Sequence, residues 1–504
     1  MAFPSARPPV ARAAAPGSSG EPLNGQTMSD LTLRLCDGTL IVLSASLSTI
    51  TTYVLLEQEA WFEKETNFVP LLVKPGMTVL DIGANVGVYS LPLARRVGPA
   101  GKVYAYEPAS EPRRLLEKSR QANSADNLHI VAAAVSDRPR QARLLAGISS
   151  ELHSLSEGGE GESVSVTTLD EEDAVRNWGS PDFVKIDAEG EERRILEGAR
   201  SFFTRHSPLV MFEVKAGAVV DKAVPDAFRA SGYRIFRLLP GAPMLVPVEP
   251  AETLDSYELN LFAAKPDRAA ALAREGWLAD EVLDWSPDDG QRAHATDLLA
   301  AQAFGPALAR LPAPAMGSPY RDALAGYALW RSERAPLSLR YAALRFSYAV
   351  LGELCRTAPQ AARLSSLARV AWDLGKRNIS LAILKAALAL GHENTVLAEP
   401  FWPANPRFDA IAPGPDVGQW FLISLVEQLE RASAYSSMFG GEGLSLNWLR
   451  QQPFVSTEIE RRYVLRQLLV GKRLAVPERL GRPADDHRNC DLWRSGSIPN
   501  TLPT

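Results

Sequence analysis

Residues 78–91 read TVLDIGANVGVYSL and combine an apolar run, an acid and two glycines. The apolar run is typical of a buried β-strand, and after Asp81 the chain turns through Gly83 and Gly87 into a helix-like segment. Small residues let a backbone approach a ligand closely, and free N–H groups at a helix start favour an anion. The stretch therefore predicts a nucleotide-binding turn.

The same strand-turn-helix pattern continues on both sides of this turn. TVLDIG is followed by VGVYSLPLARRV, KVYAYE by EPRRLLEKSRQAN, and PDFVKID by EGEERRILEGARSFF. Strands that alternate with helices predict crossover connections and a mainly parallel sheet, so the fold class is α/β. Two late runs, YRIFRLL and YELNLFAAK, have no helix between them and suit an antiparallel pair. The β-like interval 140–170 suits either an insertion over the functional edge of the sheet or a surface hairpin.

After about residue 266 the strand pattern disappears and Ala/Leu-rich segments at helical spacing follow. Residues 364–391 suit a helix hairpin of tetratricopeptide type, but no second clean copy of the 34-residue repeat is found. We therefore expect four regions: a disordered tail (1–27), an α/β domain (28–266), an all-α domain (267–475) and a Pro-rich polar tail (476–504).

Composition narrows the classes of protein. The 54 basic and 59 acidic residues leave a net charge of −5, and no basic cluster indicates a nucleic-acid partner. The sequence contains no run of about 18 consecutive apolar residues, so no membrane-spanning helix is predicted. Three cysteines far apart in the sequence suit reduced thiols, so we expect a cytoplasmic protein. The cysteines are Cys36, Cys355 and Cys490.

The residues around the turn indicate which nucleotide it binds. A nicotinamide site would read G-x-G-x-x-G, whereas this chain has only G-A-N-V-G. Asp81, close before Gly83, would repel a pyrophosphate but would suit the ammonium group of S-adenosylmethionine. Glu107 ends the next strand, where a carboxylate can bind ribose hydroxyls; NAD would use such an acid too. S-adenosylmethionine is the predicted cofactor, and a nicotinamide oxidoreductase is the weaker alternative.

A second acidic motif, KIDAEGEE, follows the strand PDFV. Asp187 would end a central strand and face the cofactor, since ligands of open α/β sheets bind beyond the carboxyl ends of the strands. Glu191 and Glu192 suit a helix N-terminus instead. Glu213, which ends PLVMFEV, suits a functional or a structural role equally. No ligand spacing supports a metal, and none is predicted.

Six motifs in this order resemble the FkbM-type methyltransferases, a branch of the class I S-adenosylmethionine-dependent enzymes. They are TVLDIGANVGVYSLPLA, GKVYAYEP, VAAAVSD, VTTLDE, DFVKIDAEGEERRILEGA and LVMFEVK, within about residues 50–265. The resemblance implies a Rossmann-like class I methyltransferase sheet and roles for particular residues. Four residues would bind the methionine part of the cofactor: Asp81, Gly83, Asn85 and Gly87. Glu107 would bind the ribose, and Ala134, Ser136 and Asp137 would flank the adenine. Asp187 and Glu189 would lie near the reacting methyl.

The resemblance also implies the reaction class, an O-methylation of a hydroxyl on a sugar, glycan or secondary metabolite. The acceptor oxygen would attack the methyl group in line, and Asp187 is the first candidate for the base, with His153 a distant second. The alternative is a scaffold whose helical half binds a partner protein, with a cofactor-binding but catalytically weak methyltransferase fold. The sequence does not identify the acceptor.

Overall fold

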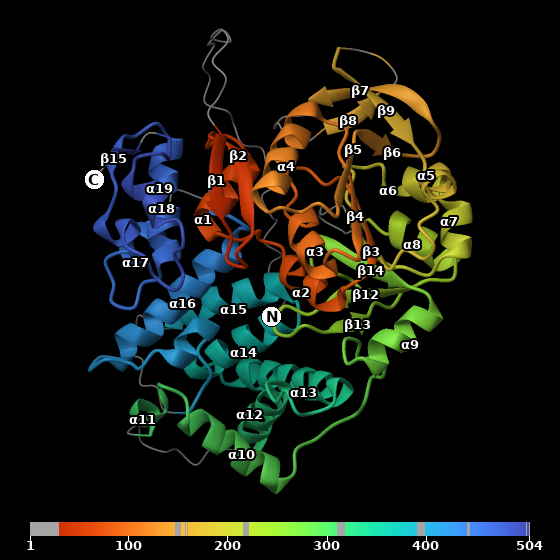
Figure 1. The fold of residues 1–504 in the computed structure, drawn as a ribbon. Coiled ribbons are helices and arrows are strands. Elements are labelled where there is room, and N and C mark those ends of the chain that lie inside the picture. Colours follow the sequence, from red (N-terminus) through yellow and green to blue (C-terminus); the bar gives the residue numbers. More distant parts are fainter. Residues whose placement is uncertain are drawn as a thin grey trace.

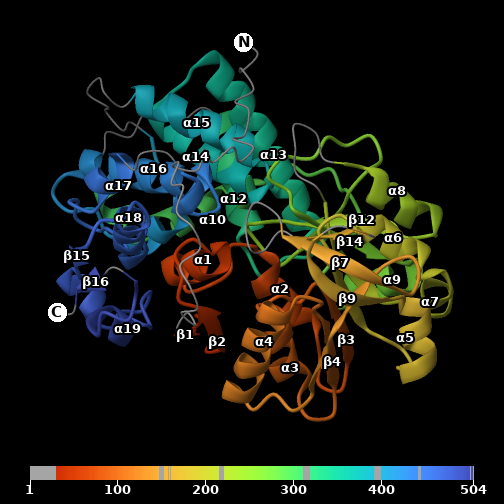
Figure 2. The same ribbon diagram turned by 90° about the horizontal axis from the view of Figure 1, so that it is seen from above.

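The computed structural model in Figure 1 describes residues 30–146, 153–156, 158, 160–214, 221–309, 318–390, 399–440, 444–499 and 501–502. The tail expected over 1–27 lies outside the described residues. A sheet flanked by helices forms one half of the molecule, and helices α10 to α18 form the other half (Figures 1 and 2). The α/β class with a helical C-terminal region is therefore confirmed.

The central sheet has eight strands in the order β13-β12-β14-β11-β10-β3-β4-β5. Its strands are β3 (Thr78–Ile82), β4 (Lys102–Tyr106), β5 (Leu128–Val131), β10 (Phe183–Ile186), β11 (Leu209–Glu213), β12 (Arg234–Leu238), β13 (Leu245–Pro247) and β14 (Asn260–Ala264). The strands β5, β4, β3, β10 and β11 are parallel neighbours, whereas β14 runs antiparallel between β11 and β12. The predicted antiparallel pairing of the two late runs is confirmed.

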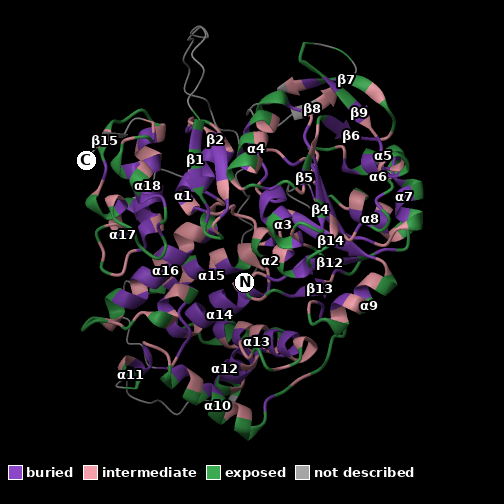
Figure 3. Cartoon of the chain, viewed as in Figure 1, coloured by how far each residue is buried: buried purple, intermediate pink, exposed green. Residues whose placement is uncertain are grey.

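Helices cover both faces of this sheet because the side chains of each strand alternate between two cores. One core contains Val79, Val103 and Phe183 of the strands, and the other contains Leu80, Tyr104 and Val184. Figure 3 shows the central strands as mostly buried. The first face is covered by α2 (Glu65–Leu72), α3 (Ser90–Val97), α4 (Ser110–Ala122) and α9 (Pro266–Arg274), and the second by α5 (Leu169–Arg176), α6 (Glu192–Glu197), α7 (Arg200–Arg205) and α8 (Ala223–Ala230).

The interval 140–170 forms most of a second, four-stranded sheet of order β6-β9-β7-β8. Its strands are β6 (Ala133–Val135), β7 (Arg140–Ala146), β8 (His153–Ser156) and β9 (Glu162–Thr167). The strands β7 and β8 pair antiparallel, and the side chain of His153 lies outside the described residues. This sheet stands beyond the end of β4 and reaches the site described below.

The helical half is an array in which consecutive helices pack against each other. Its helices are α10 (Asp289–Ala300), α11 (Gly305–Leu308), α12 (Ser318–Trp330), α13 (Leu337–Thr357), α14 (Ala361–Asp373), α15 (Arg377–Leu390), α16 (Val417–Ser433), α17 (Leu444–Leu449) and α18 (Thr457–Leu469), with the 3-10 turns η1 (Pro406–Ala410) and η2 (Ser437–Phe439). The helices α14 and α15 form a hairpin over the expected residues, turning at Gly375, whose φ is 78°. No helix in the described ranges is long and apolar enough to cross a bilayer.

The first and last described segments lie side by side. The hairpin β1 (Asp30–Arg34) and β2 (Leu40–Ser44) and helix α1 (Ile50–Gln58) share one core with α18 and with the segment after it, which holds β15 (Leu474–Ala475), η3 (Glu478–Gly481), α19 (Cys490–Arg494) and β16 (Thr501–Leu502). Asn489 Nδ2 donates to Arg34 O at 2.9 Å and to Glu59 Oε1 at 3.0 Å. The segment expected as a polar tail is folded because isolated apolar residues such as Trp493, which is fully buried, anchor it.

Candidate functional site

Two loops meet at the carboxyl ends of β3 and β10. Asp187 N donates to Ile82 O at 3.1 Å, and a Cβ atom placed on Gly83 would lie 1.7 Å from Asp187 O. Asn85 and Glu189, in these two loops, have φ values of 48° and 50°, which side-chain-bearing residues adopt rarely. The backbones approach so closely that only glycine fits at residue 83.

A cavity of about 390 Å³ opens beyond these strand ends, a volume in the usual range for a small-molecule site. Four parts of the chain form its wall: the segment before α2, the strand ends, the small sheet, and the region after α16. The residues that line it are Ile50, Thr51, Trp61, Phe62, Glu63, Ile82, Gly83, Ala84, Asn85, Val88, Tyr89, Tyr106, Glu107, Pro108, Pro112, Ala133, Ala134, Val135, Leu144, Leu155, Lys185, Asp187, Ala188, Glu189, Glu191, Glu213, Leu259, Tyr435 and Phe439. The β7–β8 hairpin thus lies over the functional edge, through Leu144 and Leu155.

The structure brings most of the residues expected at the cofactor together in this wall. They are Gly83, Asn85, Glu107, Ala134, Asp187 and Glu189. Four others stand outside the wall: Asp81, Gly87, Ser136 and Asp137.

The residues outside the wall support those in it. Ser136 Oγ lies 2.6 Å from Glu191 Oε2 and 2.9 Å from Asp137 Oδ1, and its one proton can be donated to either carboxylate. Gly87 has a φ of 93°, and a Cβ there would lie 2.4 Å from Leu116 Cδ1, so this glycine lets α4 pack against the turn. These residues therefore hold the cavity's floor in place.

Asp81 lies beneath the cavity in a buried polar cluster. Ser90 Oγ donates to Asp81 Oδ2 at 2.5 Å, whereas Asp81 Oδ1 is buried without a hydrogen-bond partner among the described residues. Lys185 Nζ lies 3.7 Å from that oxygen and donates to Asp187 Oδ2 at 2.8 Å. Burial raises the pKa of Asp81, although the Lys185 charge acts in the opposite direction. Lys185 thus connects the two acids that the sequence singled out.

Glu107 joins the turn to the second strand. Its Oε2 accepts from Asn85 N at 2.8 Å and its Oε1 from Ala109 N at 2.8 Å. Burial raises its pKa to about 7, although both N–H groups favour the charged form. Burial and the Asp187 charge likewise raise the pKa of Glu213 to about 9. At neutral pH Glu213 is therefore mostly protonated, and Glu107 is close to its titration point.

Sequence reasoning missed Glu63 and Tyr89. Tyr89 Oη donates to Glu63 Oε2 at 2.5 Å, and Lys185 Nζ lies 5.1 Å from the Tyr89 ring centroid. Burial, followed by the Asp187 charge, raises the pKa of Glu63. The only signal for Glu63 is its place in WFEKE, where two aromatic residues directly precede an acid close to the start of a helix. The sequence around Tyr435 and Phe439 did not indicate that these two residues belong to the site.

The charged side chains of the cavity wall fit S-adenosylmethionine. Six carboxyl groups and one lysine line the cavity, which suits a ligand with an ammonium and a sulfonium group. The glycine loop gives close backbone access, and the Glu107 side chain lies in the cavity wall beside this loop. Among the described residues, no group of three or more His, Cys, Asp or Glu side chains is arranged to hold a metal ion.

A comparison with known protein families identifies the region that contains the glycine loop. Residues 81–235 match the family model described as the methyltransferase FkbM domain. This region is an FkbM-type methyltransferase domain. The FkbM-type assignment made from the motifs is confirmed, and with it the Rossmann-like methyltransferase sheet and S-adenosylmethionine as the cofactor. No curated protein matches the chain.

Several solved structures are similar to part of the chain. A precorrin-6y C5,15-methyltransferase from Geobacter metallireducens is 12% identical, covers 40% of this chain and 86% of its own, and has a TM-score of 0.25. An S-adenosylmethionine-dependent O-methyltransferase from Thermotoga maritima is 17% identical, with 45% and 73% covered and a TM-score of 0.24. A methyltransferase from Streptococcus mutans in complex with S-adenosylhomocysteine is 8% identical, with 40% and 95% covered and a TM-score of 0.24.

Proposed function

We propose that the FkbM-type domain methylates a hydroxyl oxygen of a sugar, glycan or secondary metabolite. The observation that carries the proposal is that Asp187 stands in the cavity wall directly beside the glycine loop. A hydroxyl is a weak nucleophile, and a carboxylate within reach of its proton strengthens it. S-adenosylmethionine, when bound, supplies an activated methyl group on sulfur.

Two residues of the chain are candidates to accept the hydroxyl proton. Asp187 Oδ2 is held by Lys185, which fixes the carboxylate's orientation but also competes for its lone pairs. Glu63 stands in the same cavity with a raised pKa, and a base works best with a pKa near the working pH. We propose Asp187 as the base, with Glu189 beside the reacting methyl, and treat Glu63 as the competing candidate.

Mass spectrometry of hydroxyl compounds offered with S-adenosylmethionine tests the reaction, with the mass gain of one methylene unit as the expected result. Asp187→Asn should lower the rate of S-adenosylhomocysteine formation about 100- to 10,000-fold and change cofactor affinity much less. Glu197→Gln is the matched control, because Glu197 is an exposed residue of α6 outside the cavity wall. If Glu63→Gln stops turnover while Asp187→Asn retains it, the base is Glu63.

The position of the helical half helps to distinguish a methyltransferase from the alternative, a scaffold protein. Tyr435 and Phe439, which follow α16, stand in the wall of the cofactor cavity. This placement supports a contribution of the helical half to acceptor binding. Cofactor binding without any acceptor-dependent S-adenosylhomocysteine would instead favour the scaffold.

A further inference from the structure

A second cavity, of about 220 Å³, adjoins the cofactor cavity between the two halves of the molecule. The two cavities share Phe62, Glu63, Leu259 and Tyr435 in their walls. Half of the other residues in the second wall come from the helical half, through the α14–α15 turn, the end of α16, and α18. A molecule in the second cavity would therefore face the cofactor across this shared wall.

Arg377, at the start of α15, is an unusual member of this wall. Its guanidinium stacks over the rings of Tyr257 and Tyr435, with centroid distances of 3.9 Å and 4.5 Å. Its Nε donates to Ala432 O at 2.8 Å, but its Nη2 is buried without an acceptor. Arg377 has no ion pair within the described part of the chain, and burial lowers its pKa. A buried guanidinium is normally paired, whereas no carboxylate of the described residues lies within 4.0 Å of this one.

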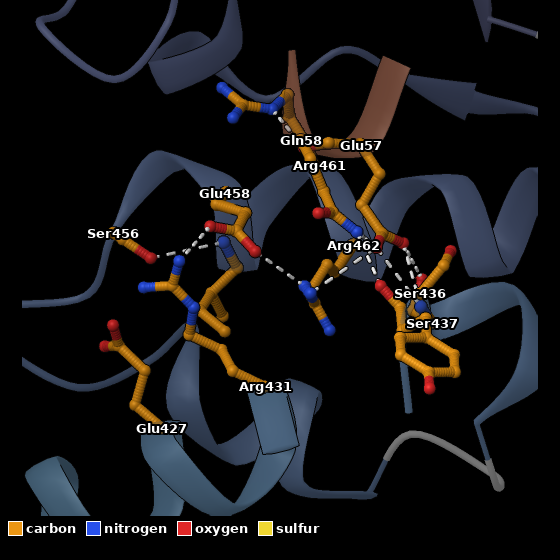
Figure 4. A network of polar contacts seen from close by, with 12 residues as sticks. Glu57, Gln58, Glu427, Arg431, Ser436, Ser437, Ser456, Glu458, Arg461 and Arg462 are labelled. Atoms are coloured by element: carbon orange, nitrogen blue, oxygen red, sulfur yellow. Dashed lines mark hydrogen bonds and ion pairs between the residues drawn. The ribbon is translucent and has the colours of Figure 1, made fainter. Parts of the chain in front are cut away.

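Arg462 adds a second donor without a partner. Figure 4 shows it in a network that joins α1 to α16 and α18. Its Nε donates to Glu458 Oε1 at 3.0 Å and its Nη2 lies 3.6 Å from Glu57 Oε1, whereas its Nη1 is buried and has no acceptor among the residues that the structure describes. Arg431 Nη2 lies 3.2 Å from Glu458 Oε2. The Glu458 charge is thus satisfied by two arginines.

The other acids of the second wall are also accounted for. Glu258 Oε1 accepts from Lys64 Nζ at 2.6 Å. The two oxygens of Asp255, whose charge also acts on Arg377, accept from the N–H groups of Asn378 at 2.9 Å and 3.0 Å. Burial raises the pKa of Glu65 to about 8, so this carboxyl is mostly protonated at neutral pH. Among the described residues the wall thus leaves two guanidinium nitrogens, Arg377 Nη2 and Arg462 Nη1, and one carboxyl oxygen, Glu65 Oε1, without hydrogen-bond partners.

We propose that the second cavity binds the methyl acceptor and that Arg377 receives an oxyanion of that acceptor, a carboxylate or a phosphate. The planar fork of a guanidinium matches both groups, and its contact with the rings of Tyr257 and Tyr435 restricts the orientation of the fork. Phe62, Glu63 and Tyr435 then stand beside the part of the acceptor that faces the cofactor. This assignment rests on the proposed function, because the ligand is taken to be the acceptor.

Anion binding to the full chain, saturated with S-adenosylhomocysteine, tests the assignment without any acceptor. The thermal midpoint is followed against inorganic phosphate and acetate at constant ionic strength, with neutral acetamide for comparison. At least one anion should raise the midpoint of the wild type, and acetamide should not. Arg377→Gln should weaken the binding of that anion about 10-fold or more. Binding of phosphate alone would indicate a phosphorylated acceptor, and binding of acetate alone would indicate an acceptor with a carboxylate.

The matched control is Arg345→Gln. Arg345 is exposed and lies 5.8 Å from the Tyr341 ring centroid, outside both cavities, so its loss should leave anion binding unchanged. Arg377→Lys keeps the charge without the fork and should restore part of the affinity, which also controls for misfolding. The assignment is overturned if neither anion binds or if Arg377→Gln binds as the wild type does. Methylation of a neutral acceptor, with no anion binding, would keep the proposed function and remove this inference.

Discussion

Gly83→Ala tests whether the close contact of the two loops shapes the cofactor cavity. An alanine Cβ would start 1.7 Å from Asp187 O, and real Cβ contacts under 3.0 Å essentially do not occur. The loop after β10 would therefore have to move by more than about 1 Å, a displacement large enough to disturb a binding site. Gly83 also has a φ of 78°, which costs an alanine about 1–2 kcal/mol.

Gly76→Ala separates these two effects. Gly76 has a φ of 88°, but a Cβ there would meet no atom within 4 Å. Both variants should lose about 1–2 kcal/mol in the free energy of unfolding from backbone strain, and Gly83→Ala should lose more. If the displaced loop breaks one or two hydrogen bonds, only Gly83→Ala should lose affinity for S-adenosylhomocysteine, roughly 5- to 150-fold in calorimetry. Equal affinity and equal stability of the two variants would refute the argument.

Three more expectations concern the cavity and the core. Glu107→Ala removes the acceptor of two backbone N–H groups. Calorimetry should therefore show an affinity for S-adenosylhomocysteine that is about 5- to 150-fold lower, while the circular dichroism spectrum stays unchanged. An unchanged affinity would mean that Glu107 does not bind the ribose. Burial raises the Glu213 pKa from 4.5 to about 9, so folding takes up a proton, and the free energy of unfolding should decline between those pH values. Urea titrations at several pH values should show that the free energy of unfolding declines less steeply with pH for Glu213→Gln than for the wild type. Equal slopes for the two proteins would contradict the raised pKa of Glu213. Trp493→Ala should lower the free energy of unfolding by about 3–5 kcal/mol, whereas a loss below about 1 kcal/mol would mean that the last segment packs loosely.

Local sequence predicted the strand-turn-helix unit and the position of acids at strand ends. The run 78–82 is apolar and is followed by glycines, so both its strand and its turn follow from near neighbours. The antiparallel pair β12–β14 was predictable for the same reason, because two strand-like runs had no helix between them. Glu107 likewise stands where the end of β4 places it.

The surroundings of the acids depend on contacts between distant parts of the chain. Asp81 is paired in register with Lys185 across β3 and β10, so a cation from a remote strand lies near its carboxylate. The sequence near Asp81 contains no sign of that neighbour. Glu63 and Tyr435 reach the cavity from segments that flank the matched domain on both sides, and no periodicity marks such a convergence.

The packing of the first described segment against the last has a consequence for biosynthesis. A ribosome releases residues 30–58 long before it makes α18 and residues 476–499, which share a core with them. The cofactor cavity also lacks Tyr435 and Phe439 until synthesis has passed the middle of the helical half. Contacts between such distant residues form slowly, because the intervening chain must first be ordered. The nascent chain therefore completes the wall of the cofactor cavity only after Tyr435 and Phe439 have been synthesised.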